Sequence, residues 1–406
     1  MAAAGPIHAP AVDAFANPLA ASAMTPYPAP AAAVLNAAGF GRAREEIGRW
    51  PGYAVTPLRA LPALAGSLGI ASLFYKDERG RFGLRSFKAL GGAYAVLRVL
   101  QQRLAEQGIE ASGAELLAGA HRSRTADITV TCATDGNHGR SVAWGAQRFG
   151  CRCVIVVHET VSEGRCEAIR AYGATVERVP GNYDDSVRHA DAQARAHGWT
   201  VVSDTSYPGY TEIPTDVMHG YGVLGHEMAD ALGDTPPTHV FLPAGVGGLA
   251  AAVAAVFWLR WGERRPRVIV VEPRTADCHL RSAMAGEPTV VGGSLETVMA
   301  GLACGEVSPL AWQVVSRAAQ AFVAIDDDPI GPAMRRLAEP CGDDPAIVAG
   351  ETGVAGLAAL ILALDHPGVT ALLALGPDSR VLLIGSEGDT DPALYRDLTG
   401  LSPAAP

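Results

Sequence analysis

Short apolar runs alternate along the chain with longer segments in which apolar residues recur at helical spacing. The apolar runs have the length of strands that are buried on both faces, and they occupy residues 127–133, 153–157, 239–243, 268–272 and 381–384. The helical segments occupy residues 87–107, 138–149, 163–172, 184–197, 213–232 and 248–261. This alternation predicts an α/β protein with mostly parallel sheets.

Two groups of these units, near residues 127–205 and 239–390, predict two doubly wound domains whose sheets face a shared cleft. The expected large domain comprises residues 41–90 and 206–406, and the expected small domain comprises residues 91–205. Residues 1–40 are rich in Ala and Pro and lack a clear apolar period. We expect them to form an extended or partly disordered N-terminal arm.

The composition argues against several classes of protein. The formal net charge of the 406 residues is -10 and the basic residues form no long cluster, so nucleic acid is not an expected partner. The longest apolar stretches, at 249–259 and 354–364, are shorter than the ~20 residues that span a bilayer, so we expect no membrane contact and a cytoplasmic location. The 7 cysteines include no C-x-x-C pair, which argues against a disulfide framework and a zinc site. A contact between Cys278 and Cys304 stays open.

Lysine is rare in this chain. Of the 32 Lys and Arg residues, only Lys76 and Lys88 are lysines, and a primary amine can form a Schiff base where a guanidinium cannot. Lys88 opens a predicted helix, where the helix dipole favours an anionic ligand, such as a phosphate-bearing aldehyde cofactor. Compositional drift is the alternative explanation for two remaining lysines.

A glycine-rich loop at residues 245–248 joins a predicted strand to an apolar helix. Its backbone N–H groups could converge on a phosphate at the helix N-terminus, although a purely structural turn uses the same glycines. The loop lacks the Lys-Ser/Thr of a P-loop and the full G-x-G-x-x-G pattern.

Two further loops follow predicted strands. In residues 134–140 the backbone donors could hold a substrate carboxylate, and Asn137 offers an amide to a cofactor oxygen. Asp135 could instead be a helix cap or turn residue, and we expect His138 to pack or cap. In residues 385–390, Ser386 would place a hydroxyl at the floor of the cleft.

Taken together, residues 86–88, residues 135–139, the 245–248 loop and Ser386 resemble the fold-type II pyridoxal phosphate enzymes, the class of threonine deaminase and tryptophan synthase β. Residues 81–84, 134–140, 209–215 and 299–306 are more specifically similar to the diaminopropionate ammonia-lyases. The resemblance covers roughly residues 40–395.

The resemblance implies pyridoxal 5'-phosphate as the cofactor, bound in a Schiff base by Lys88 at the active-site cleft. It implies that Phe87 packs beside the ring, that Asn137 donates to the ring 3′ oxygen and that Ser386 faces the pyridine nitrogen. The large domain would then bind the cofactor, and the small domain would lie on the substrate side. The loop that would hold the phosphate consists of Gly245, Val246, Gly247, Gly248 and Leu249.

Asp135 and Asp204 match the catalytic acidic positions of the family. Threonine deaminases carry a small neutral residue at the position of Asp135, and an acid beside a bound carboxylate is unfavourable unless the substrate brings a second cation. The β-ammonium of 2,3-diaminopropionate is such a cation. With Lys88 and Asp135 on opposite faces of the α-carbon, both enantiomers are expected substrates. The expected substrate-binding residues are Thr134, Asp135, Gly136 and Tyr207.

The implied activity is that of an ammonia-lyase, which converts D- and L-2,3-diaminopropionate to pyruvate and ammonia by α,β-elimination. A neutral serine opposite the ring nitrogen favours elimination over transamination. Family resemblance also implies a homodimer. Members of the family carry Trp-Glu where this chain has Tyr207-Pro208. Three alternative functions therefore stay open: a serine or threonine dehydratase, a β-replacement enzyme acting on a related β-substituted amino acid, and a paralogue without catalytic activity.

Overall fold

The chain divides into two compact units. The structure is a computed structural model and describes residues 5–134, 136–181 and 183–403. The first unit comprises residues 1–37, 55–85 and 224–406, and the second comprises residues 38–54 and 86–223. The expected domain boundaries, and the roles expected for the two domains, stay predictions.

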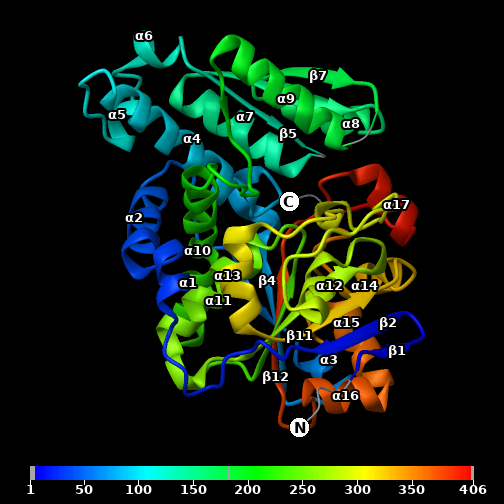
Figure 1. Cartoon of the computed structure of the whole chain (residues 1–406). Helices are drawn as coiled ribbons and strands as arrows, with labels where there is room; N and C mark the ends of the chain where they lie inside the picture. Colours follow the sequence, from blue (N-terminus) through cyan, green and yellow to red (C-terminus); the bar gives the residue numbers. More distant parts are fainter. Residues whose placement is uncertain (1–4, 135, 182, 404–406) are drawn as a thin grey trace. The chain divides into compact units, whose positions relative to one another are not determined.

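The first unit contains an eight-stranded mixed sheet with the order β1-β2-β11-β10-β9-β12-β4-β3 (Figure 1). The five central strands from β11 to β4 are parallel, and β1, β2 and β3 pair antiparallel at the two edges. The strands are β1 (Ile7–Ala9), β2 (Val12–Ala16), β3 (Leu58–Ala60), β4 (Ser72–Asp77), β9 (His239–Pro243), β10 (Arg267–Pro273), β11 (Ala319–Ile325) and β12 (Arg380–Gly385). The predicted strands at 239–243, 268–272 and 381–384 are confirmed as β9, β10 and β12.

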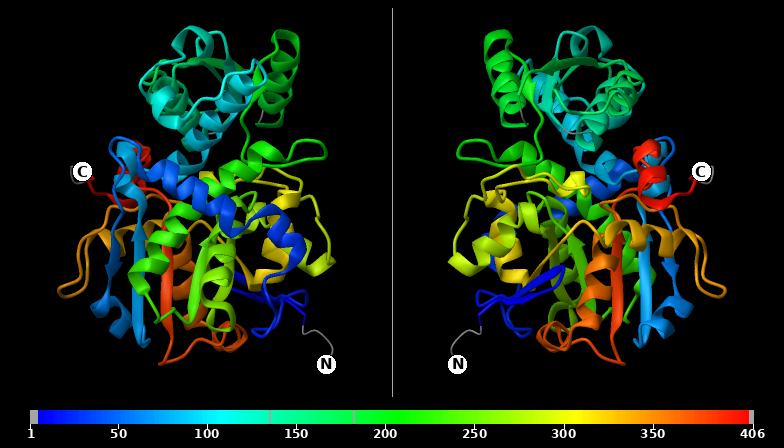
Figure 2. Two further views of the ribbon diagram at one scale, coloured as in Figure 1. Left: turned by 90° about the vertical axis from the view of Figure 1, so that its left-hand side faces the viewer. Right: turned by 90° about the vertical axis from the view of Figure 1, so that its right-hand side faces the viewer.

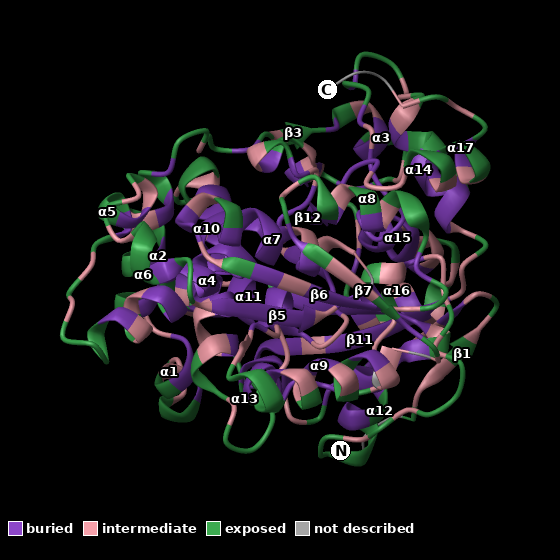
Figure 3. Ribbon diagram, turned by 90° about the horizontal axis from the view of Figure 1, so that it is seen from above, coloured by how far each residue is buried: buried purple, intermediate pink, exposed green. Residues whose placement is uncertain are grey.

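The helices of the first unit follow these strands along the chain. They are α1 (Ala29–Val34), α3 (Pro62–Ser67), α11 (Gly248–Trp261), α12 (Cys278–Ala285), α13 (Pro309–Ala318), α14 (Ile330–Ala338), α15 (Ala355–Asp365), α16 (Pro367–Leu373) and α17 (Pro392–Thr399), with 3₁₀ turns at Glu78–Gly83, Gly262–Arg264, Arg274–Ala276 and Ala300–Leu302. α11 is apolar on all sides and is buried along most of its length (Figure 3). Such a helix gains its stability from packing on every face.

The N-terminal segment differs from the extended or disordered arm expected from the sequence. β1 and β2, dark blue in Figure 2, form an antiparallel pair. β2 joins the sheet through β11, with Phe15 opposite Phe322. Val12, Ala14 and Phe15 are buried. Two short strands in an Ala- and Pro-rich stretch give little periodic signal, and only the sheet edge that they cover selects their conformation.

The second unit contains a four-stranded parallel sheet with the order β7-β6-β5-β8. The predicted strands at 127–133 and 153–157 are confirmed as β5 (Thr129–Ala133) and β6 (Arg152–His158), joined by β7 (Thr175–Val179) and β8 (Thr200–Val201). The helices are α2 (Ala37–Gly48), α4 (Lys88–Ala105), α5 (Gly113–Leu117), α6 (Arg122–Thr125), α7 (Asn137–Phe149), α8 (Glu163–Arg170), α9 (Tyr183–His197) and α10 (Glu212–Leu232), which continues into the first unit. All six predicted helices are present in the two units.

No single helix among the described residues is long and apolar enough to cross a membrane. The helix pair α15 and α16 reaches that length and apolarity only when both helices are taken together, and the pair is bent by 117°. None of the 7 cysteines, all of which lie within the described part of the chain, forms a disulfide bond.

Candidate active site

Lys88 is the first residue of α4 in the second unit. Its backbone is fixed on both sides, because its N–H donates to Ser86 Oγ at 3.3 Å and its carbonyl accepts from Ser141 Oγ at 2.6 Å. The residue before this turn, Arg85, adopts the left-handed conformation with φ of 57°. The lysine side chain is 19% exposed, so its amine is accessible although its stem is packed.

The Lys88 amine donates to the carboxylate of Asp204, three residues beyond the end of β8. Burial alone would raise the pKa of Asp204, but the charge of Lys88 and the hydrogen bond from its amine outweigh this effect and hold the pKa well below its usual range. Asp204 is therefore ionised at neutral pH. The structure thus brings together two of the three predicted catalytic residues.

His138 also faces this pair. Its Nε2 lies 2.8 Å from the carbonyl oxygen of Val202, and its Nδ1 lies 3.8 Å from Asp204 Oδ2 without a hydrogen-bond partner among the described residues. Because the carbonyl oxygen of Val202 can only accept a hydrogen bond, Nε2 carries the proton of the neutral ring and Nδ1 carries a lone pair. Burial lowers the pKa of His138. The expectation of a packing or capping role did not include this contact with Asp204.

Two aromatic rings lie beside the amine. The rings of Phe87 and Tyr221 are 4.7 Å apart, and Lys88 Nζ lies 5.5 Å and 5.7 Å from their centroids. Tyr221 belongs to α10, and a Cβ at Gly91 would lie 2.3 Å from its ring. Tyr221 was not predicted as a site residue from the sequence. The glycine pair at 91–92 inside a helix was the available signal, since glycine there is unfavourable unless another group packs closely.

The loop before α7 holds the predicted substrate-binding residues Thr134 and Gly136. Thr134 Oγ1 accepts from the backbone N–H groups of Gly136 at 3.0 Å and Gly139 at 3.1 Å, so this hydroxyl already fixes the loop at the start of the helix. Asn137 is the first residue of α7, and its Oδ1 accepts from Arg140 at 3.1 Å. Asp135 lies outside the described residues. The ligand contacts predicted for this loop stay predictions.

Tyr207 follows Asp204 closely and is 42% exposed. Its ring stacks on that of Tyr210 at 4.7 Å between centroids. Tyr210 in turn ties down the segment that carries Asp204, since its hydroxyl donates to Val201 O and accepts from Ser203 N, both at 2.9 Å. Tyr210 was not singled out in the sequence.

In the first unit, the 245–249 loop joins β9 to the N-terminus of α11. Gly247 has a φ of 96°, and a Cβ at this position would lie 2.5 Å from the ring of His279, so only glycine is accommodated. The first amides of α11 have no partner within the helix. With the helix dipole, they form an arrangement suited to a phosphate.

Ser386, directly after β12, is 2% exposed. Its Oγ is buried and makes no hydrogen bond with any described residue. A buried hydroxyl without a partner is unfavourable unless a ligand supplies one, and a pyridine nitrogen is a suitable partner. The buried Ser386 hydroxyl therefore fits the ring nitrogen of pyridoxal phosphate, and the 245–249 loop fits its phosphate.

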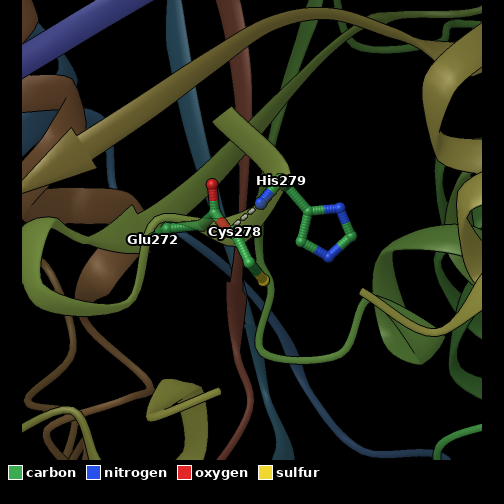
Figure 4. Close-up of side chains that lie close together, drawn as sticks. All are labelled: Glu272, Cys278 and His279. Atoms are coloured by element: carbon green, nitrogen blue, oxygen red, sulfur yellow. Dashed lines mark hydrogen bonds between the residues drawn. The ribbon is translucent and has the colours of Figure 1, made fainter. Parts of the chain in front are cut away.

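Figure 4 shows a second cluster in the first unit, formed by Glu272, Cys278 and His279, whose donor atoms lie within 4.8 Å of one another. A carboxylate, a thiol and an imidazole can hold a transition metal. Here, however, the carboxylate oxygens accept from the N–H groups of His279 at 2.7 Å and Leu280 at 2.9 Å, and His279 Nε2 is engaged with Gly245 O at 3.1 Å. The carboxylate oxygens and the ring Nε2 of this cluster are therefore already hydrogen-bonded within the first unit.

A family model described as pyridoxal-phosphate dependent enzyme matches residues 49–386. The chain is 42% identical over 352 residues to diaminopropionate ammonia-lyase of Escherichia coli (strain K12). The matched region covers 86% of this chain and 87% of the relative.

Two crystal structures of diaminopropionate ammonia lyase from Escherichia coli match with coverage of 95% of this chain and 96% of theirs. The complex with D-serine has a TM-score of 0.86 at 36% identity. The complex with an aminoacrylate-PLP azomethine reaction intermediate has a TM-score of 0.84 at 37% identity. These similarities confirm the resemblance seen in the sequence motifs.

Proposed function

Because the chain belongs to the pyridoxal-phosphate dependent enzymes, in the branch of the diaminopropionate ammonia-lyases, we propose that it is an ammonia-lyase acting on 2,3-diaminopropionate. The observation that carries this proposal is the hydrogen-bonded pair of Lys88 and the ionised Asp204. A primary amine and a carboxylate in one site are the groups needed to move an α-proton and to bind a β-ammonium.

The residues of this chain fit the cofactor of the family. When bound, pyridoxal phosphate supplies an electron sink for the negative charge that develops at the α-carbon. Lys88 would bind its aldehyde, with Phe87 beside the ring and Asn137 at the 3′ oxygen. Ser386, whose buried Oγ makes no hydrogen bond with the described residues, would face the ring nitrogen. The 245–249 loop would hold the phosphate.

The proposed roles follow from charge and position. Lys88 takes the α-proton from one face of the substrate, and Asp135 takes it from the other face in the opposite enantiomer. Asp204 binds the β-ammonium, since its low pKa keeps the carboxylate charged. Loss of the α-proton and the β-amine releases one ammonia and leaves 2-aminoacrylate. Water then converts this product to pyruvate and a second ammonia.

A substrate panel tests the reaction. D- and L-diaminopropionate, serine and threonine are supplied in turn, and ammonia and pyruvate are quantified together. We expect two ammonia per pyruvate and the highest kcat/KM with diaminopropionate. Faster turnover of serine or threonine would instead favour a dehydratase, and a new amino acid formed when a thiol is added would favour β-replacement.

Borohydride reduction tests the cofactor site. The chain offers only two lysines, and Lys76 is 1% exposed within an ion pair with Glu227. A reduced cofactor adduct should therefore be found by peptide mass spectrometry on Lys88 and be absent from the Lys88→Ala variant. An adduct on Lys76, or none on either lysine, would contradict the proposal.

We also propose a homodimer in the cytoplasm, as expected from the sequence resemblance. Light scattering coupled to size-exclusion chromatography measures the first of these properties. A mass of one chain, near 42.0 kDa, would refute the dimer without affecting the proposed reaction.

A further inference from the structure

The proposed function uses the glycine loop but gives no role to the buried Glu272, Cys278 and His279 beneath it. His279 is fully buried, and its Nε2 lies 3.1 Å from the carbonyl oxygen of Gly245. The Cys278 thiol also lies near this carbonyl, at 3.8 Å, and near Glu272 Oε1, at 3.7 Å. This side of the loop is therefore held by side chains of α12.

The bond between His279 and Gly245 fixes more than one carbonyl. In a trans peptide the C=O and the following N–H point in opposite directions. Holding Gly245 O toward His279 therefore directs the N–H of Val246 away from His279. The next peptide is held in the same way, because Val246 O accepts from Ser308 N at 2.9 Å, which sets the direction of the Gly247 N–H.

The position of the imidazole is itself determined by Glu272 on β10. The two oxygens of this buried carboxylate accept from the N–H groups of His279 and Leu280, at the start of α12. These two hydrogen bonds satisfy amides at the helix N-terminus that have no partner within the helix. The ring of His279 also stacks on Phe322, with 6.3 Å between centroids and 11° between planes.

The surroundings also set the protonation of His279. Burial lowers its pKa to about 4, and the hydrogen bond to Gly245 offsets this only in part. The imidazole is therefore neutral at pH 7, and because the partner of Nε2 is a carbonyl, Nε2 carries the proton. Nδ1 has no hydrogen-bond partner among the described residues. The single N–H of the ring is thus committed to Gly245.

We propose that His279 is a positioning residue for phosphate binding: its Nε2–H holds the Gly245 peptide so that the N–H groups of Val246 and Gly247 face the phosphate of the cofactor. The proposal rests on the proposed function, since it assigns the loop to that phosphate. It predicts that His279 contributes to the binding of pyridoxal phosphate and not to that of pyridoxal, which lacks the phosphate.

Three variants separate the hydrogen bond from packing. His279→Leu removes the donor and keeps an apolar side chain of similar size. In His279→Gln the amide nitrogen replaces Nε2 in position and can still donate to Gly245 O. In His279→Asn the amide is shorter and ends near the position of Nδ1, so it cannot reach this carbonyl.

The experiment measures the dissociation constants of pyridoxal phosphate and of pyridoxal for the apoenzymes by equilibrium dialysis, with far-UV circular dichroism to check folding. Loss of one buried hydrogen bond should weaken pyridoxal phosphate about 10-fold in His279→Leu and His279→Asn. We expect pyridoxal to change less than about 2-fold, and His279→Gln to stay within about 3-fold of the wild type for both ligands. If His279→Leu does not fold, the Gln and Asn variants form the comparison.

The outcomes distinguish the two proposals. Equal weakening of pyridoxal phosphate and pyridoxal, unchanged affinities, or a Gln variant as weak as the Asn variant would overturn the role of His279. Failure of the wild type to bind pyridoxal phosphate would instead refute the proposed function. The ³¹P NMR shift of the bound phosphate gives a second readout, and we expect it to move in His279→Asn and to match the wild type in His279→Gln.

Discussion

Four charged side chains form a buried network in the first unit, and its charge balance can be tested. Arg81 donates to both carboxylate oxygens of Glu78, each at 2.8 Å, and to both oxygens of Glu227, at 2.8 and 2.7 Å. Lys76 Nζ lies 2.5 Å from Glu227 and 2.8 Å from the carbonyl oxygen of Thr56. The four side chains are at most 4% exposed, so two positive and two negative charges cancel away from water.

The Glu227→Gln substitution removes one negative charge and leaves Lys76 and Arg81 opposite Glu78 alone. Removing one partner from a buried ion pair typically costs about 3–5 kcal/mol, because the remaining charge is buried without compensation. We expect a loss of about that size in the free energy of unfolding. Lys76→Met should also be destabilising, since it leaves an uncompensated negative charge.

The double variant Lys76→Met/Glu227→Gln restores neutrality, because Arg81 and Glu78 remain paired. Its loss of stability should be smaller than the sum of the two single losses by about 2 kcal/mol. Urea unfolding followed by circular dichroism and tryptophan fluorescence measures all three variants. The matched control is Asp234→Asn, which removes an exposed ion pair with Arg260 in the same unit and should cost less than about 1 kcal/mol.

The contribution of Glu227 to the free energy of unfolding depends on pH with a definite sign. Burial would raise the pKa of Glu227, but the hydrogen bonds and charges of Arg81 and Lys76 lower it well below its usual range. Its stabilising effect is therefore present above the unfolded pKa and is lost as the pH falls toward the folded pKa. Glu227→Gln should lose less stability than the wild type on acidification. Losses as small as in Asp234→Asn, or a double variant worse than the sum, would refute the charge-balance argument.

Three further substitutions have definite expected outcomes. Gly247→Ala combines a left-handed backbone with a Cβ 2.5 Å from His279, and the strain of about 1–2 kcal/mol should weaken pyridoxal phosphate binding by about 10-fold or more; equilibrium dialysis would show unchanged affinity if the loop were free to adapt. Asp204→Asn should lower kcat by about 10²–10⁴-fold while the cofactor absorbance is retained, and a kcat near that of the wild type would exclude Asp204 from the reaction. Burial and, to a lesser extent, the charges of Arg42 and Arg98 lower the pKa of His219 to about 4 in the folded chain. On acidification, the imidazole of the unfolded chain is therefore protonated before that of the folded chain. The free energy of unfolding is highest above pH ~6.5 and decreases as the pH falls toward 4. Urea unfolding at pH 7 and 4.5 measures the decrease in the free energy of unfolding between these pH values, which should be about 2–3 kcal/mol smaller in His219→Gln than in the wild type. If His219→Gln reduces this decrease no more than the substitution of the exposed His197 by Gln, burial of His219 does not account for it.

Three of the five central parallel strands could be predicted because their signal is local. A strand that is buried on both faces is a continuous apolar run, so β9, β10 and β12 are visible in the sequence. The N-terminal strands were missed for the opposite reason. In β2 only Val12, Ala14 and Phe15 turn inward, and an edge of the sheet supplied by β11, some 300 residues later in the sequence, selects their conformation.

The candidate site was predictable to the extent that chemistry is carried by residue type. Lysine scarcity, the glycine pattern and the loop after the last predicted strand pointed to Lys88, the 245–249 loop and Ser386, and the motif resemblance added Asp204. The sequence could not reveal that His138 faces Asp204, because the contact crosses 66 positions. His279 also looked unremarkable, since its role depends on a carbonyl 34 positions earlier.

Residue type and local period were thus enough to predict the α/β class, part of the order of strands and helices, and Lys88 as the candidate reactive amine, and the motifs indicated the family of this chain. Tertiary structure alone decided which distant groups interact in the interior: Lys76 and Arg81 with Glu227, and the His279 ring with the Gly245 carbonyl. Local patterns record how each segment meets water, whereas hydrogen bonds and ion pairs between distant segments depend on where the completed sheets place them.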